Sequence, residues 1–333
     1  MDLGLVSYGL YLPPGRETAE QIAARSGLDP RLVREELGVE EKPWPGPDDQ
    51  PVPMAVRAAK SALASGRVDP NQVDLVLWVG EEYKDYIAQT AAIRLQEEVG
   101  CGRAWAFDLV GQGVTQVLGL RVARDLMLGD PGIETVLLAG GARHIDLVDY
   151  RNPHTRFLLP YSASGGAMIL RRGLDRNRLL GWAVRVDADM ADEVYVPGGG
   201  TLHPFAPDNL DSPLMFFHAP RPERLETYLD EVFPERLAQV VEAALAEAGL
   251  DGLDYLALRH LAPGLRRRVL DRLNLPEECS LPLVRFGHHG ANDPLISLDA
   301  GLSSGAIRGG ARVVLAAAGI GFTYMAAVIQ WGK

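Results

Sequence analysis

A glycine-flanked segment, Val110-Gly111-Gln112-Gly113-Val114, separates an apolar run that predicts a buried strand from the amphipathic helix pattern VTQVLGLRVARDLMLG. Many enzymes hold a nucleophile at a strand-to-helix elbow of this kind. The helix N-terminus directs several free N–H groups and a partial positive charge at one point. This elbow, however, contains no Cys, Ser or carboxylate. The sequence therefore predicts the support for a nucleophile without the nucleophile itself.

Histidines near the ends of two later segments are the other candidates for chemistry. His260 ends the run LDYLALRH, and His288 and His289 are adjacent in FGHHG. A histidine can act as a general base or donate a hydrogen bond near neutral pH. The alternatives are a structural hydrogen bond for His260 and solvent exposure for the adjacent pair. Two adjacent histidines rarely reach one metal ion without further ligands, so we expect no metal site.

The segments around these residues alternate between buried strands and helices. Near-continuous apolar runs such as VDLVLWVG and ETVLLAGG are typical of parallel strands that are covered on both faces. Helical patterns such as PVPMAVRAAKSALASG and QTAAIRLQEEVG lie between them. This alternation predicts an α/β protein.

The two parts of the chain repeat the same order of elements. AVRAAKSALASGRVDPNQVDLVLWVG in the first part is similar to VVEAALAEAGLDGLDYLALRH in the second, because each is a helix followed by a strand. We therefore expect two copies of one α/β unit, with boundaries at 1–172 and 173–333.

Bulk properties exclude several classes of function. The chain has 333 residues and a net charge of −11, with 44 acidic and 33 basic residues mixed along it. This balance argues against nucleic-acid binding and against docking on anionic membranes. The N-terminus has neither a signal-peptide pattern nor an apolar membrane span. Cys101 and Cys279 lack metal-type spacing and lie far from the elbow, so we expect a cytoplasmic protein without disulfides.

Five stretches in a fixed order carry a resemblance that covers nearly the whole chain. They are YGLYLP, VDPNQVDLVLWVG, AFDLVGQGV, LRHLAPGLRRRVLDRLNLP and the segment from FGHHGANDPLISL to GIGFTYMAAVIQW. The sequence resembles β-ketoacyl-ACP synthase III and its thiolase-superfamily relatives, including the HMG-CoA-synthase-like branch. The resemblance implies a duplicated five-layer αβαβα thiolase fold and a homodimer. It also implies a tunnel for the pantetheine arm of a CoA or acyl carrier protein thioester, which is the substrate, with no covalently bound cofactor.

In that family a Cys at the elbow is acylated. A His and an Asn then promote decarboxylation of a malonyl thioester, and the resulting carbanion attacks the acyl group. The family Cys lies five positions after a strand-end Asp, and counting from Asp108 places Gly113 there. With a loop one residue shorter, the position falls on Gln112. Its amide would then mimic an acylated thiol, or it is simply a polar residue at the start of a helix.

The remaining family positions are partly retained. His260 matches the catalytic His, and His288 stands where Asn is expected. A shift of one residue makes His289, or Asn292 and Asp293, alternatives for this third member. The turn Gly319-Ile320-Gly321 matches the one that donates a backbone N–H to the oxyanion hole.

The positions that hold the carrier depart further from the family. Arg31 replaces a Trp that stacks on adenine, and Glu35 replaces a basic residue one turn later. Leu265 stands where Arg is common and is followed by Arg266. Arg31 and Arg266 are therefore the candidate contacts with CoA or an acyl carrier protein.

Three hypotheses follow. The first is an acyltransferase similar to β-ketoacyl-ACP synthase III that acts on acyl or malonyl thioesters. Without a nucleophile, it would decarboxylate malonyl thioesters or transfer an acyl group directly with His260 as general base. The second is a non-catalytic partner subunit of a condensing enzyme. The third is an active synthase whose Cys was replaced by Gly through engineering.

Overall fold

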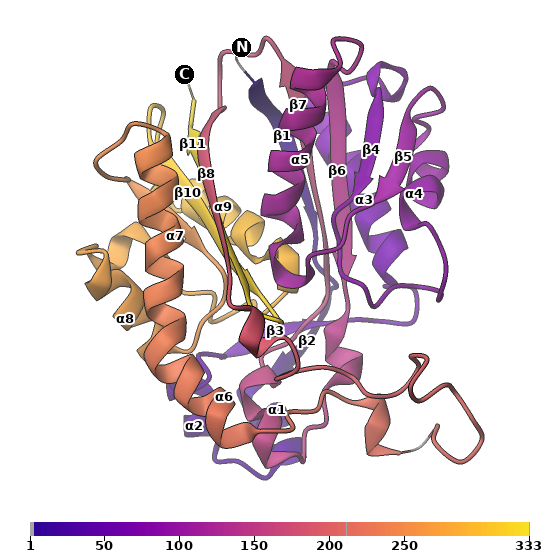
Figure 1. Cartoon of the computed structure of the whole chain (residues 1–333), viewed down its shortest axis with the longest axis vertical. Coiled ribbons are helices and arrows are strands. Elements are labelled where there is room, and N and C mark those ends of the chain that lie inside the picture. The colour runs from indigo at the N-terminus through magenta and orange to yellow at the C-terminus, as the bar shows by residue number, and fades with distance from the viewer. Residues whose placement is uncertain (1–2, 211, 333) are drawn as a thin grey trace.

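The computed structural model describes residues 3–210 and 212–332. Its strands form two groups with helices between them (Figure 1). The first group has the order β5-β4-β6-β7-β1. In it, β4 is parallel to both neighbours and β7 is antiparallel to both neighbours. These strands are β1 (Leu3–Tyr11), β4 (Leu75–Trp78), β5 (Trp105–Asp108), β6 (Thr135–Ala142) and β7 (Ser164–Arg172).

The second group repeats this arrangement with the order β8-β11-β10-β9. Here β9 is parallel to β10, and β11 is antiparallel to both neighbours. The two groups meet where Gly4 of β1 pairs with Arg178 of β8. The strands are β8 (Arg178–Val186), β9 (Tyr255–Leu258), β10 (Arg312–Gly319) and β11 (Thr323–Gln330). The repeat confirms the predicted duplication, and the predicted boundary between residues 172 and 173 falls between β7 and β8.

Helices cover both groups and fill the space between them (Figure 1). On one outer side, α3 packs on β1, β6 and β7, with α4 beside β4 and β5. On the other outer side, α7 packs on β8, β10 and β11, with α8 beside it. The central layer holds α5 and α9. The helices are α3 (Pro51–Gly66), α4 (Ala91–Val99), α5 (Thr115–Gly129), α7 (Phe233–Glu247), α8 (Pro263–Arg272) and α9 (Asp293–Ser303). These layers confirm the five-layer αβαβα architecture.

Small residues let α3 lie very close to its sheet. Its buried face is rich in alanine, and glycines stand opposite it in the strands. A Cβ atom on Gly9 would lie 2.2 Å from the carbonyl oxygen of Ala58, and one on Gly165 would lie 2.1 Å from that of Met54. The central layer is packed by a core of large aliphatic side chains, which α5 and α9 share with strands of both groups. These contacts fix the strand ends where the candidate site lies.

Several smaller elements lie near the lower end of the molecule in Figure 1. The ribbon of β2 (Gly15–Thr18) and β3 (Glu41–Trp44) was not predicted from the sequence. The helices α1 (Ala19–Ser26), α2 (Pro30–Glu35) and α6 (Pro222–Thr227) complete this part. A π-helical turn over 228–232 joins α6 to α7. No helix in the described part of the chain combines the length and the hydropathy of a membrane span.

Candidate active site

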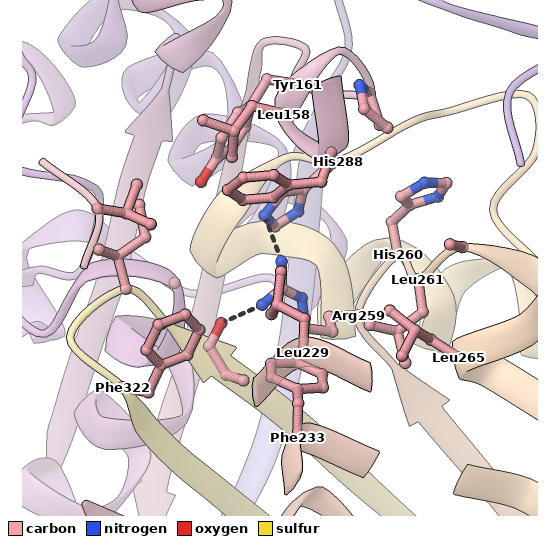
Figure 2. A pocket seen from close by; sticks show the side chains of 18 of the residues that line it. Leu158, Tyr161, Leu229, Phe233, Arg259, His260, Leu261, Leu265, His288 and Phe322 are labelled. Atoms are coloured by element: carbon pink, nitrogen blue, oxygen red, sulfur yellow. Dashed lines mark hydrogen bonds between the residues drawn. The ribbon is translucent and has the colours of Figure 1, made fainter. Parts of the chain in front are cut away.

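The predicted site residues gather around one cavity of about 110 Å³. The wall is formed by the elbow before α5, the residues after β9, the FGHHG loop, and the turn between β10 and β11. Figure 2 shows these side chains, with aromatic and aliphatic groups completing the wall. From the predicted set the cavity is lined by Gln112, Gly113, His260, His288, Gly319 and Ile320. Gly321, also predicted, does not line it.

The elbow is a single 3₁₀ turn, Gln112–Val114, which leads into α5. Gln112 has a φ of 54°, a value that residues other than glycine rarely adopt. Strained backbone of this kind concentrates at functional sites. Gln112 lines the cavity, and its side chain makes no hydrogen bond to another described residue. The geometry therefore favours Gln112 over Gly113 as the residue in the nucleophile position.

Gly113 has a packing role. A Cβ atom at this position would lie 2.7 Å from the carbonyl oxygen of Ala318 and 3.4 Å from Cα of Gly319. The first distance is shorter than Cβ atoms normally allow, and the atom it concerns is backbone. Because the end of β10 lies against the elbow, the expectation that a Cys fits at Gly113 is not supported by this backbone. The same contact weighs against an original Cys at position 113 that engineering replaced by glycine.

His288 is the centre of a buried hydrogen-bonded chain. Its Nδ1 lies 2.5 Å from Oδ2 of Asp293. Its Nε2 lies 2.7 Å from Nη2 of Arg259, a contact that Figure 2 shows. A guanidinium can only donate, so Nε2 of His288 accepts and the ring proton sits on Nδ1. Burial lowers the pKa of His288, which keeps the ring neutral. His288 therefore presents no N–H group to the cavity, contrary to the expectation that it donates to a substrate oxygen.

Asp293 anchors three backbone and side-chain groups at once. Besides His288, its carboxylate accepts the backbone N–H of His260 at 2.9 Å and that of His289 at 2.7 Å. Burial alone would raise the pKa of Asp293, but His288, His289 and Arg259 hold it far below its usual value. Asp293 stays ionised and links the segment after β9 to the FGHHG loop.

His260 also uses its N–H group inside the protein. Its Nε2 lies 3.0 Å from the carbonyl oxygen of Leu37, which can only accept, so Nε2 carries the proton. Its Nδ1 is buried and has no partner among the described residues. Burial lowers the pKa of His260 to about 4. His260 thus offers a lone pair rather than a donor, and in Figure 2 its ring lies apart from the contact between Arg259 and His288.

The alternative third members do not line the cavity. His289 is fully buried, and its Nε2 lies 2.8 Å from the carbonyl oxygen of Phe286. Asn292 is held by Gln116, whose Nε2 is 2.9 Å from Oδ1, and by Ser164, whose Oγ is 3.0 Å from Nδ2. Among the candidates for the third member, His288 therefore lines the cavity and the others do not.

Arg259 was missed by the sequence analysis although it directly precedes His260. Its Nη1 donates to the carbonyl oxygen of Ala318 at 2.7 Å, and its Nε is buried without a partner among the described residues. The guanidinium carbon lies 5.7 Å from the centre of the Phe233 ring. The available signal was a charged residue at the carboxyl end of a buried strand, next to a candidate catalytic histidine.

Two buried ionisable side chains, which the sequence analysis also missed, support the cavity wall. Lys42 of the ribbon donates to the carbonyl oxygen of Tyr161 at 2.7 Å, and the Tyr161 ring stacks on His288 at 4.4 Å between centroids. Burial lowers the pKa of Lys42 to about 8, despite Glu17 at 3.3 Å. Glu81 accepts the backbone N–H of Ala291 at 2.7 Å. These contacts fix the segments on either side of His288.

A second, more open hollow of about 750 Å³ adjoins the cavity and shares Phe157, Leu229 and Leu265 with it. It forms an entrance lined by two basic residues, His154 and Arg156, and by four carboxylates, Glu223, Glu226, Asp230 and Glu231. We call this hollow the outer entrance.

The two predicted carrier contacts lie outside this entrance. Arg31 is on the surface, with 79% of its side chain exposed, and pairs with Asp29 at 3.1 Å. Arg266 is buried, and its guanidinium binds the carbonyl oxygens of Glu277 and Ser280. Because Arg266 closes the loop after α8, the prediction that it contacts the carrier is not supported.

Comparisons with known proteins support the family resemblance and the fold. Residues 244–331 match the family model of the C-terminal part of 3-oxoacyl-[acyl-carrier-protein] synthase III. The chain is 25% identical to the β-ketoacyl-[acyl-carrier-protein] synthase III of Symbiobacterium thermophilum, over 99% of this chain and 98% of the relative. It is also 25% identical to the acetoacetyl CoA synthase NphT7 of a Streptomyces species, over 98% of each.

The solved structures extend the likeness to three dimensions. The 3-oxoacyl-(acyl carrier protein) synthase III of Pseudomonas aeruginosa superposes with a TM-score of 0.86 at 23% identity, over 100% of this chain and 99% of that chain. That of Thermus thermophilus gives a TM-score of 0.83 at 22% identity, over 99% and 100%. The fold is therefore the thiolase fold. The comparisons confirm the resemblance that the sequence carries, to the condensing enzymes of the β-ketoacyl-ACP synthase III type.

Proposed function

We propose that this chain decarboxylates a malonyl-type thioester without forming an acyl-enzyme. The observation that carries the proposal is that Gln112 and Gly113 of the elbow, neither of them a nucleophile, line one cavity with His260 and with His288, which stands where the family has Asn. An amide side chain cannot be acylated by a thioester, so the condensing reaction cannot begin. Loss of CO₂ requires no nucleophile.

Decarboxylation needs one bond to break and one proton to add. The bond between the carboxylate and the α-carbon of the malonyl group breaks, and its electron pair moves into the thioester enolate as CO₂ leaves. A proton from water then adds to the α-carbon and gives the acetyl thioester. Positive charge or hydrogen-bond donors beside the thioester oxygen stabilise the enolate. The cavity volume of about 110 Å³ suits an acyl group of a few carbon atoms.

Direct acyl transfer is the weaker form of the same proposal. It would need His260 to remove a proton from an acceptor, and its free Nδ1 is the atom to do so. Burial lowers the pKa of His260 to about 4, so the ring is a poor base near neutral pH. Decarboxylation, which needs no base, is therefore favoured.

The substrate would be a thioester of CoA or of an acyl carrier protein, the carriers named in its relatives. The outer entrance is the route by which a pantetheine arm would reach the elbow, because the two hollows share wall residues. Its excess of carboxylates opposes both phosphate groups and an acidic carrier protein. We therefore expect the full carrier to bind no more tightly than pantetheine alone.

A non-catalytic partner subunit is the second candidate function. Two observations favour it. The nucleophile is missing, and the ring N–H groups of His260 and His288 are both bound within the protein. A protein that only completes another condensing enzyme would need neither group free.

Incubation with malonyl-pantetheine separates these candidates. The two measurements are the amount of CO₂ released and the intact mass of the protein. We expect slow CO₂ release and no mass increase. Burial raises the pKa of Cys101 to about 11, so this thiol is not a substitute nucleophile. An acyl adduct on Cys101 or Cys279 would contradict the proposal, and absence of both CO₂ and adduct would support the partner subunit.

A further inference from the structure

Arg259 places a positive charge in the wall of the cavity without a carboxylate in direct contact. Within residues 3–210 and 212–332, no ion pair joins its guanidinium to an Asp or Glu. Its two identified partners, the carbonyl oxygen of Ala318 and Nε2 of His288, are neutral acceptors at 2.7 Å. A guanidinium has five N–H groups, so three remain without a partner, including that of the buried Nε.

The surroundings make this arrangement costly unless a ligand completes it. The aromatic rings of Phe233 and Phe322 and the side chain of Leu229 lie in the same wall (Figure 2). Burying a charge beside apolar groups disfavours the folded state unless the charge is paired. Asp293 compensates only in part, because the imidazole of His288 stands between the two charges. The cavity therefore attracts negative charge.

The histidines cannot meet this need. His260 and His288 are neutral, and both use their N–H group inside the protein. His260 has only the lone pair on Nδ1 to present to a ligand, and the lone pair of His288 on Nε2 already accepts from Arg259. A lone pair repels a carboxylate. Among these three wall residues, Arg259 alone has N–H groups to give.

We propose that Arg259 is the residue that binds the negative charge of the acyl group, so that the cavity selects carboxylate-bearing acyl thioesters over neutral ones. This inference rests on the proposed function for its substrate class. It adds a specificity-determining residue that touches the substrate. When CO₂ leaves, the negative charge moves from the carboxylate to the oxygen of the thioester enolate, and protonation of the α-carbon by water removes it.

Equilibrium binding tests the inference without any turnover. The probes are the malonyl and acetyl amides of aminopantetheine, in which an amide replaces the thioester and decarboxylation is slow. We expect the wild-type chain to bind the malonyl amide at least tenfold more tightly than the acetyl amide. The variant Arg259→Met should bind the two within about twofold of each other. Arg259→Lys, which keeps the charge but not the fork of N–H groups, should retain part of the preference.

Arg267→Met is the matched control, because Arg267 is an exposed arginine on α8 with its own partner Glu277 at 2.8 Å. It should leave the preference unchanged. If Arg259→Met does not fold, the test is whether Arg259→Lys prefers the malonyl amide less strongly than the wild type does. Equal binding of both amides by the wild type, or a full preference that survives in Arg259→Met, would overturn the inference. A clear preference without any CO₂ release would overturn the proposed function alone.

Discussion

The carbonyl oxygen of Ala318 occupies the space that a side chain on Gly113 would need, at 2.7 Å from the position of its Cβ atom. The end of β10 and the elbow before α5 are thus in direct backbone contact. The neighbouring Gln112 is not restricted in this way, because it already carries a side chain and lines the cavity. This contact determines where a nucleophile can be restored.

We predict that Gln112→Cys gains self-acylation by an acyl thioester and that Gly113→Cys does not. The N-terminus of α5 would lower the pKa of a thiol at position 112, as it does at other helix starts. Cysteine at position 113 should instead destabilise the fold by about 1–3 kcal/mol through overpacking. Intact-protein mass after incubation with acetyl-pantetheine, together with the melting temperature, measures both effects. Acylation of Gly113→Cys alone would show that the elbow is assigned one residue wrongly.

The carboxyl group of Glu81 makes the stability of the protein depend on pH. It is completely buried, and its Oε2 has no partner among the described residues. Burial raises its pKa from 4.5 to about 7, with a smaller contribution from Asp293 and an opposing one from Arg259. The folded chain therefore keeps a proton that the unfolded chain releases above about pH 4.5. Stability should fall as pH rises from about 5 to 7.

We predict that Glu81→Gln removes this dependence. Buried histidines such as His144, whose pKa burial lowers to about 3, act in the opposite direction, so the difference between wild type and variant is the quantity to compare. That difference in the free energy of unfolding should change by on the order of 2 kcal/mol between pH 5 and pH 8. Urea denaturation at four pH values measures it. The exposed Glu98→Gln is the control, and a pH-independent difference for Glu81→Gln would contradict a raised pKa.

The carboxylates of the outer entrance should weaken binding of carriers that bear phosphate. We predict that the double change Glu223→Gln and Glu226→Gln lowers the KM for malonyl-CoA by about threefold to tenfold at low salt. The KM for malonyl-pantetheine, which is uncharged at that end, should stay the same. Raising the salt concentration should reduce the difference for CoA. A parallel change for both substrates would mean that these side chains shape the entrance rather than act through their charge.

The sequence predicted the architecture well because the hydrophobic pattern specifies it. The buried strands and the repeated order of elements were identified from apolar runs, and the elbow from its glycines. The β2–β3 ribbon was missed, because its four-residue strands contain charged residues and a proline and carry no alternating pattern. The strand β5 was correctly predicted as a strand, but the prediction that it is buried was wrong: it lies at the edge of the sheet and is partly exposed.

The site could be predicted only as far as residue types and order allow. Gln112, His260 and His288 were named, but the direction of each hydrogen bond depends on partners distant in the chain. The N–H group of His260 binds Leu37, and Arg259 turns His288 into an acceptor. Lys42 and Glu81 support the site because they are buried. The sequence alone does not show that these two charged residues are buried. The space at Gly113 likewise depends on β10, some 200 residues later.

The edge strand β5 is where we expect a second copy of the chain to bind. It ends one side of the sheet, and Trp105 on it is 50% exposed. Ile93 and Ile87 nearby are 56% and 72% exposed. The segment that carries Ile87 is tied to the end of β5 by Lys84, whose Nζ lies 2.5 Å from Asp108. Exposed apolar groups beside an unpaired strand edge are typical of an interface.

We predict a homodimer at micromolar concentration, which Trp105→Glu dissociates by raising the dimer Kd at least tenfold. A carboxylate would be buried against apolar groups in the paired state, whereas water solvates it in the monomer. Val184→Glu is the matched control, because Val184 on β8 is 58% exposed and lies on a different part of the sheet. Sedimentation velocity of the three proteins measures the effect. A monomeric wild type, or dissociation by Val184→Glu alone, would place the interface elsewhere or rule it out.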